Sequence, residues 1–350
     1  MRKVSPRHAD ADADAGLAKA ASCGTNDNVK AIIIGGGPAG ISAALRLQQM
    51  TDISVTVYEL YPEPRTIGGA VATAPNGMRL FHRLGVHEQL VSRGSSCAQI
   101  TLRSLRSGVL TSYDSTAGVS ERNGGFGPLR IKRIELVKVL LAAADKAGIP
   151  VHYGKRLVKV QESADSVTVT FEDGSTDEAD MVLGCDGIHS AVRKQYVDPE
   201  QEPEYSGLSG IGAIIPRPKG LPESMASQLR GINGTLTTAG ALGVVCCAPD
   251  GEEIFWGMSK EVALPPGGDT RDGWEVTRAD QVTDFRTNAL RMLGGAENPW
   301  ADTVRVLVAE THSVGFYPVY KLPPGQRWHR GRCVLVGDAA HAMQPHAGQG

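Results

Sequence analysis

A glycine-rich turn near the amino terminus has the residue types and spacing to bind a dinucleotide. The sequence GGGPAG begins at Gly35 and ends at Gly40. Gly35 permits a tight turn, Gly37 lets the backbone approach a pyrophosphate, and Gly40 lets a helix pack closely on the preceding strand. Free N–H groups at the start of that helix, around Pro38 and Ala39, favour phosphate oxygens. The turn therefore predicts a nucleotide site.

The elements around this turn are those that a dinucleotide site requires. An apolar run at 31–34 predicts a buried strand, a periodic segment after the turn predicts a helix, and 54–58 predicts a second strand that ends on Glu59. An acid about 20 residues beyond the glycines is placed to accept hydrogen bonds from ribose hydroxyls. An ordinary turn and a solvated Glu59 are the alternatives, and the pattern does not distinguish NAD from FAD.

Two further strand ends carry glycine and aspartate. One apolar run ends in GCDG, with Asp186 and Gly187, and another ends in GDAAH, with Asp338. A carboxylate at the carboxyl end of a parallel strand faces the crevice where ligands bind. Small neighbouring residues leave room for a ligand to reach the backbone. Each stretch alone is as readily a turn, but three in this order predict a shared site.

Length and composition narrow the classes of protein. A chain of 350 residues can bury a large core and hold two domains. A formal net charge of −2 gives no reason to expect nucleic acid as a partner, and no membrane span is expected because no run of 18 apolar residues occurs. Six scattered cysteines without a CxxC pair indicate a reduced, cytoplasmic protein. Residues 1–28, rich in Ala and Asp, are expected to form a disordered tail.

The order of the predicted elements indicates an α/β protein with two interleaved parts. A Rossmann-like nucleotide-binding domain is expected to be assembled from the separate segments 29–97, 128–200 and 315–350. A β-rich substrate domain, formed by 98–127 and 201–314, is expected to be inserted between them.

Within these segments, residues 60–74 are expected to form a loop and 281–293 a helix. Residues 305–314 and 333–336 are expected to form apolar strands. One group of apolar residues has two alternative roles, as a roof over a reaction site or as ordinary sheet core, with core favoured: Ile211, Ile214, Ile215, Val244, Val245, Phe255 and Trp256.

Taken together, these stretches resemble the FAD-dependent aromatic hydroxylases, the single-component flavoprotein monooxygenases of the p-hydroxybenzoate and salicylate hydroxylase type. The resemblance covers residues 29–350. It rests on GGGPAG with Glu59, on CDG with Ser190 and Arg193, on RIEL beginning at Arg133, and on the final GDAAHAMQPHAGQG. It implies FAD as the cofactor and NADPH or NADH as a transient electron donor.

The resemblance also implies roles for individual residues. Glu59 would hold the adenosine ribose and Asp338 the ribityl chain. Arg133 would lie near the pyrophosphate, although a surface cation at a helix start is the alternative. Asp186 and Gly187 belong to a motif linked in the family to both FAD and the nicotinamide donor.

Further contacts are implied around the flavin ring. Gly69 and Ala72 would contact it through the backbone, with an ordinary loop as the alternative, and Pro345 would lie against it. The last three residues would present N–H groups that stabilise negative charge on the reduced flavin: Gly348, Gln349 and Gly350.

The implied reaction is hydroxylation of a small aromatic substrate. FAD takes electrons from the nicotinamide donor and reacts with O₂, while the protein excludes water. No residue is assigned as the acid or base, because none is privileged by its spacing. The chain ends at Gly350, where the family's flavin-contacting helix is expected to begin. The alternatives are therefore a truncated, catalytically inactive FAD-binding protein or another FAD oxidoreductase of the same fold.

Overall fold

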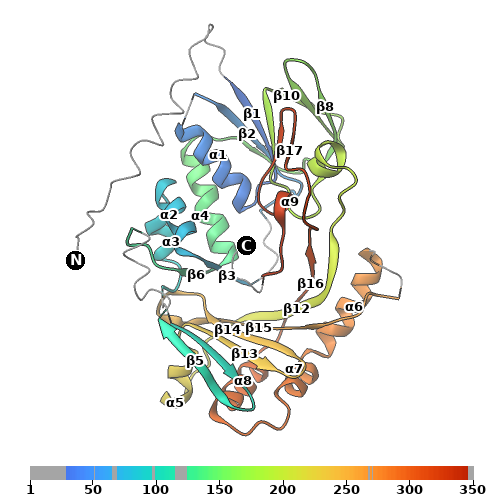
Figure 1. The fold of residues 1–350 in the computed structure, drawn as a ribbon. Coiled ribbons are helices and arrows are strands. Elements are labelled where there is room, and N and C mark those ends of the chain that lie inside the picture. The colour runs from blue at the N-terminus through green and yellow to red at the C-terminus, as the bar shows by residue number, and fades with distance from the viewer. Residues whose placement is uncertain are drawn as a thin grey trace, which may run out of the picture.

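The computed structural model describes residues 29–50, 52–64, 69–96, 99–114, 124–266, 269 and 271–345. The tail predicted at 1–28 lies outside the described residues. Figure 1 shows an upper part built around β1 and a lower part built around β12 to β15. The long strands β12 (Glu204–Pro216) and β16 (Gly315–Lys321) run between the two parts.

The upper part contains a six-stranded sheet in the order β17-β18-β11-β1-β2-β7. Its strands are β1 (Lys30–Ile34), β2 (Ser54–Tyr58), β7 (Val151–His152), β11 (Met181–Gly184), β17 (His329–Arg330) and β18 (Cys333–Leu335). Every pairing is parallel except that of β17 with β18. The central strand β1 has the sequence KAIII, and its last four residues are buried. A continuous apolar run of this kind is typical of a parallel strand that is covered on both faces of the sheet.

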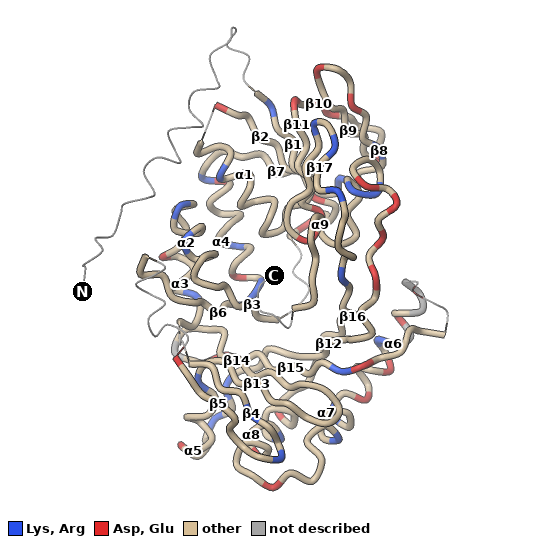
Figure 2. The backbone as a smooth tube through the Cα atoms, in the orientation of Figure 1, with Lys and Arg blue, Asp and Glu red and all other residues tan. Residues whose placement is uncertain are grey.

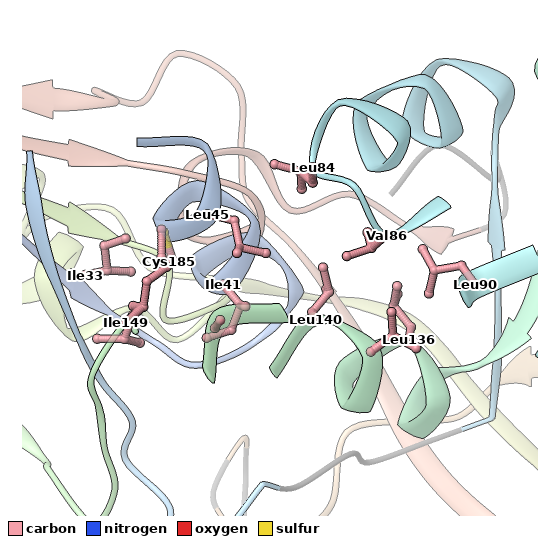
Figure 3. Close-up of a cluster of buried hydrophobic side chains, with 14 of the residues drawn as sticks. Ile33, Ile41, Leu45, Leu84, Val86, Leu90, Leu136, Leu140, Ile149 and Cys185 are labelled. Carbon is pink, nitrogen blue, oxygen red and sulfur yellow. The ribbon is translucent and has the colours of Figure 1, made fainter. Parts of the chain in front are cut away.

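One face of this sheet is covered by helices. Figure 3 shows their shared core, in which Ile33 of β1 lies with Ile41, Leu45 and Leu140. The helices are α1 (Pro38–Met50), α2 (Pro75–Arg83), α3 (His87–Val91) and α4 (Arg133–Lys146). The opposite face packs on the hairpin strands β8 (Leu157–Glu162), β9 (Val167–Phe171) and β10 (Thr176–Ala179). The turns that follow β1, β11 and β18 therefore lie at the carboxyl ends of these neighbouring strands, between the two covered faces.

The lower part is a seven-stranded sheet in the order β16-β12-β15-β14-β13-β4-β5. Its remaining strands are β4 (Gln99–Ser104), β5 (Gly108–Asp114), β13 (Ile232–Thr237), β14 (Gly240–Cys246) and β15 (Glu253–Glu261). Three helices, α6 (Arg271–Thr283), α7 (Phe285–Leu293) and α8 (Pro299–Ala309), cover one face. A short α5 (Glu223–Ala226) precedes β13, and α9 (Asp338–His341) follows β18.

Three of the expected elements differ in the structure. The strand predicted at 305–314 is wrong, because residues 305–309 belong to α8 and residues 310–314 form no strand. Pro299 opens that helix, the Asn298 side chain accepts the Ala301 N–H, and its buried residues recur at helical spacing. The helix predicted at 281–293 is broken at Asp284 between α6 and α7. The loop predicted at 60–74 contains strand β3 (Ala70–Thr73), which pairs with β6 (Leu129–Lys132).

The pairing of β4 with β13 places residues from both expected substrate segments in one sheet; the domain boundaries themselves stay a prediction. Among the described residues, no helix is long and apolar enough to cross a membrane. In Figure 2, Lys and Arg are interspersed with Asp and Glu over the molecule.

An ion pair that joins the two layers of the upper part makes stability depend on pH. Asp177 of β10 accepts hydrogen bonds from Lys30 Nζ at 2.5 Å and from the Tyr58 hydroxyl at 2.8 Å. Burial acts to raise the pKa of Asp177, but these two donors, the Glu178 N–H and the charge of Lys30 together outweigh it, and the pKa is lowered. A folded-state pKa below the unfolded value stabilises the fold above about pH 3.9, and this stabilisation is lost as the pH falls.

We therefore expect Asp177→Asn to lower the unfolding free energy at neutral pH by about 1 kcal/mol or less. The difference from wild type should vanish as the pH falls through the carboxyl range. Urea unfolding at several pH values measures it, with Asp165→Asn in the exposed 163–166 turn as the control. A difference independent of pH would contradict the assignment.

Candidate functional site

The three predicted glycine–aspartate stretches meet at one edge of the six-stranded sheet. They follow β1, β11 and β18, which are neighbours in that sheet. Gly35 has φ +108°, and a Cβ added to it would overlap the Cys185 carbonyl oxygen. A Cβ added to Gly337 would lie 3.0 Å from the Cβ of Ala39. Segments about 150 residues apart (Gly35 and Cys185) and about 300 residues apart (Ala39 and Gly337) therefore touch here through backbone and small side chains.

The glycine turn has the geometry that a phosphate site needs. Gly35 donates to the Tyr58 carbonyl at 2.8 Å, which ties the turn to β2. A Cβ on Gly40 would overlap the Gly35 carbonyl, so only glycine lets α1 start this close to β1. A Cβ on Gly37 would meet no atom of the described residues within 4 Å. The position beside Gly37 is therefore open, and N–H groups at the start of a helix such as α1 favour phosphate oxygens.

Glu59 directly faces this turn. One carboxylate oxygen accepts the Gly36 N–H at 2.6 Å, and the other accepts the Tyr61 N–H at 3.0 Å. These two hydrogen bonds fix the carboxylate beside the turn. A carboxylate has about four acceptor positions, so oxygen lone pairs remain for ribose hydroxyls.

The sequence predicts that the Asp186 carboxylate faces the crevice where ligands bind, but in the structure it is hydrogen-bonded to its own loop. Its carboxylate accepts the Ser190 hydroxyl at 2.5 Å and the N–H groups of Ala191 and Val192 at 2.6 and 3.1 Å. Burial raises the pKa of Asp186, against the effect of these donors. The side chain thus holds its own loop, in which Gly187 has φ +78°. Any contact of Asp186 with a cofactor would act through this loop.

Arg193 joins two of the three segments of the site, although the sequence offered it only as part of a motif. It is 1% exposed. Its guanidinium donates to the Ala339 carbonyl at 2.9 Å and also to the carbonyl of Ile188. Burial lowers the pKa of Arg193, and the charge of Asp186 opposes that shift. Arg193 therefore ties the loop after β11 to α9, whose first residue, Asp338, is exposed.

The other predicted contacts cluster at the boundary with the seven-stranded sheet. The Gly69 carbonyl accepts the backbone N–H of Arg133 at 3.0 Å, at the start of α4. A Cβ on Gly69 would overlap the Phe255 ring of β15. Ala72 is exposed on β3. Gly69 therefore lies between the two parts of the protein.

Of the flavin contacts predicted near the carboxyl terminus, the described residues include only Pro345. Pro345 is exposed and is the last described residue. The other three predicted contacts, Gly348, Gln349 and Gly350, lie outside the described residues. Their contacts with the flavin stay predictions.

Comparisons with known proteins identify the family to which this chain is related. A model of the FAD binding domain family matches residues 28–224. An FAD-dependent urate hydroxylase from Klebsiella pneumoniae is 30% identical over 324 residues, which are 92% of this chain and 77% of the relative. A 6-hydroxynicotinate 3-monooxygenase from Pseudomonas fluorescens is 27% identical over 322 residues, 91% of this chain and 77% of that one. The crystal structure of Klebsiella pneumoniae HpxO complexed with FAD and uric acid has a TM-score of 0.76 and 27% identity, and the match covers 93% and 77% of the two chains.

The space beside Gly37 leads to a first test of the site. We expect Gly37→Ala to fold normally, because no described atom lies where the methyl group would be. The methyl group would occupy the space expected for the pyrophosphate, so the dissociation constant for FAD should rise about tenfold or more. Flavin fluorescence titration measures this constant. The control, Gly295→Ala in an exposed turn, should bind FAD like wild type; equal affinity in Gly37→Ala would refute the assignment.

The carbonyl contacts of Arg193 lead to a second test. Arg193→Met keeps much of the apolar stem but leaves buried carbonyl oxygens without their donor, which costs about 1–3 kcal/mol for each group. We expect a lower melting temperature and weaker FAD binding, and Arg193→Lys should restore part of both. If Arg193→Met lost stability but kept wild-type FAD affinity, Arg193 would not position α9 for the cofactor.

Proposed function

The chain belongs to the FAD binding domain family, and from this premise we propose that its three converging strand ends hold the FAD. It is an FAD-dependent monooxygenase that uses NAD(P)H to hydroxylate a small aromatic or heteroaromatic substrate. When bound, FAD supplies the electron transfer and oxygen activation. The oxygen atom comes, in our proposal, from O₂.

One observation carries the assignment of the site. The turn after β1, the loop after β11 and α9 after β18 are in contact through Gly35, Cys185, Gly337 and Ala39. A site built from such distant segments exists only in the folded chain. Its residues supply N–H groups, a fixed carboxylate at Glu59 and an exposed one at Asp338 around one edge of the sheet.

Each group has a proposed task. The N–H groups at the start of α1 bind the pyrophosphate, with the exposed guanidinium of Arg133 near it. Glu59 accepts from the adenosine ribose, and Asp338 accepts from the ribityl hydroxyls. Gly69, at the boundary with the seven-stranded sheet, lets the flavin ring come close to the backbone.

Two finer points belong to the same proposal. The reaction takes place in the cytoplasm, which is supported by four buried cysteines that are free thiols: Cys185, Cys246, Cys247 and Cys333. The proposed substrate is a small ring compound of the kind that the relatives' names contain. The three candidates are urate, 6-hydroxynicotinate and salicylate.

Turnover by the purified chain tests the proposal. We expect a bound flavin spectrum, slow NAD(P)H oxidation alone, and faster oxidation with at least one of these three substrates. When the reaction is run under isotopically labelled O₂, mass spectrometry should detect one labelled oxygen atom in the hydroxylated product. Boiled protein and protein stripped of FAD are the controls.

Other outcomes distinguish the alternatives. Bound FAD that no nicotinamide donor reduces would identify a non-catalytic flavin-binding protein. Rapid donor oxidation with no labelled product for any ring compound would identify an oxidase or reductase of this fold. A protein that stays colourless in excess FAD would refute the site itself.

A further inference from the structure

A cavity opens beside strand β4 and the edge strand β5 of the seven-stranded sheet. Its volume of about 540 Å³ lies within the range of about 300–1,000 Å³ that small-molecule sites have. The β4–β5 hairpin lines one side, Gln228 after α5 lines another, and the start of α8 lines the rest. The described residues that line it include none from the three strand ends of the candidate FAD site. Figure 1 shows β5, α5 and α8 at the opposite end of the molecule from β1.

The cavity lies on the helix-covered face of the sheet. Arg103 of β4 lies directly opposite Thr235 of β13, and residues opposite each other on neighbouring strands share a face. The Thr235 hydroxyl accepts a hydrogen bond at 2.8 Å from the indole of Trp300, which belongs to the core beneath the helices. Phe255, by contrast, lies on the other face, against Gly69. The sheet therefore separates the cavity from the candidate FAD site.

Neutral groups hold the Arg103 side chain in the wall of the cavity. Its guanidinium lies over the Trp300 ring, 4.5 Å from the ring centre. Its Nε and Nη2 donate to the side-chain oxygen of Asn233 at 3.4 and 3.3 Å. Burial lowers the pKa of Arg103. A guanidinium has five N–H donors, so two long hydrogen bonds to one oxygen leave donors for a ligand.

The two arginines that line the cavity lack carboxylate partners. Among the described residues, neither Arg103 nor Arg106 forms an ion pair. Arg305 of α8 differs, because it pairs with Asp302 at 2.6 Å. Of the described residues that line the cavity, only Glu297 is acidic, and it is exposed. Two cations and one anion therefore leave one positive charge uncompensated, which favours an anionic ligand.

The chemistry of the walls defines the class of anion. The planar fork of a guanidinium matches the two oxygens of a carboxylate. Leu105, Val109 and Pro299 supply apolar surface next to the arginines, and Val109 is 53% exposed. Covering this surface with the apolar part of a ligand is favourable. Glu297 repels a second negative charge, so a dianion such as a phosphate monoester fits less well than a monocarboxylate.

We propose that this cavity binds a small organic monocarboxylate, with the carboxylate between Arg103 and Arg106 and the apolar part against Leu105, Val109 and Pro299. The site goes beyond the proposed function, because it shares no lining residue with the proposed FAD site and does not depend on that assignment. A bound acid would contact the β4–β5 hairpin and the start of α8 together, and would therefore stabilise the packing of this helix at the edge of the sheet.

Binding of 4-fluorobenzoate to the FAD-loaded protein, followed by fluorine NMR, tests the proposal. Arg106→Gln should fold normally, because the exposed Arg106 side chain makes no hydrogen bond or ring contact with the described residues. We expect the dissociation constant to rise about tenfold in Arg106→Gln and to fall about threefold in Glu297→Gln. Arg291→Gln, which removes an exposed cation from α7, is the matched control and should bind like wild type. Flavin absorbance in the same titration reports any acid bound beside the flavin, and this signal should be the same in all four proteins.

Two further probes test the class of ligand. The uncharged 4-fluorobenzamide should bind about tenfold more weakly than 4-fluorobenzoate, and inorganic phosphate at the same concentration should not displace the acid. Affinity for 4-fluorobenzoate that is unchanged in Arg106→Gln, or binding seen only through the flavin signal, would overturn the site. Displacement by phosphate, or equal binding of the amide, would overturn the ligand class. Reduction of FAD by NAD(P)H is a separate measurement and bears on the proposed function alone.

Discussion

The site depends on the close approach of three pieces of backbone at the ends of β1, β11 and β18. Gly35 lies against the Cys185 carbonyl, Gly40 against the Gly35 carbonyl, and Gly337 against Ala39. Side chains at these glycines would separate the strands from α1 and from each other. The carboxylates and N–H groups around the edge of the sheet then have fixed positions. Arg193 and Glu59 hold this arrangement by hydrogen bonds to backbone groups rather than by exposed ion pairs.

A second constraint joins this site to the seven-stranded sheet. The Lys132 ammonium, just before α4, lies 2.6 Å from the Glu253 carboxylate of β15. Two residues along β15, the Phe255 ring touches Gly69, whose carbonyl accepts the Arg133 N–H. The start of α4 therefore contacts both the predicted flavin edge and the sheet that faces it. A rigid junction of this kind suits a reaction that needs a ring held at a fixed distance from a cofactor and shielded from water.

Much of the site is predictable from the sequence because its signals are local. The turn at Gly35 to Gly40 and the acid at Glu59 depend on a strand–helix–strand pattern within about 30 residues, which the order and spacing of those residues predict well. The strand predicted at 305–314 is wrong because a short apolar run fits a helix or a strand equally. The residue that marks the start of the helix, its N-cap Asn298, lies outside this run. The direction of the Asp186 side chain was not predictable, since it depends on donors supplied by its own loop. The contact between Gly337 and Ala39 needed the order of strands in the sheet, which no local pattern contains.

The two faces of the seven-stranded sheet show the same limit more sharply. Phe255 and Trp256 are neighbours in sequence, yet Phe255 lies against Gly69 of the FAD-binding part and Trp256 is fully buried under the helices. The residues that the sequence offered as a roof or as core are therefore divided between the two faces of one sheet, and the roof stays a prediction. Gly243 and Gly257 lie on the same face as Phe255, and each glycine inside a strand costs about 0.5–1 kcal/mol relative to alanine. The large core on the other face, with Trp256, Trp300 and Phe316, offsets that cost.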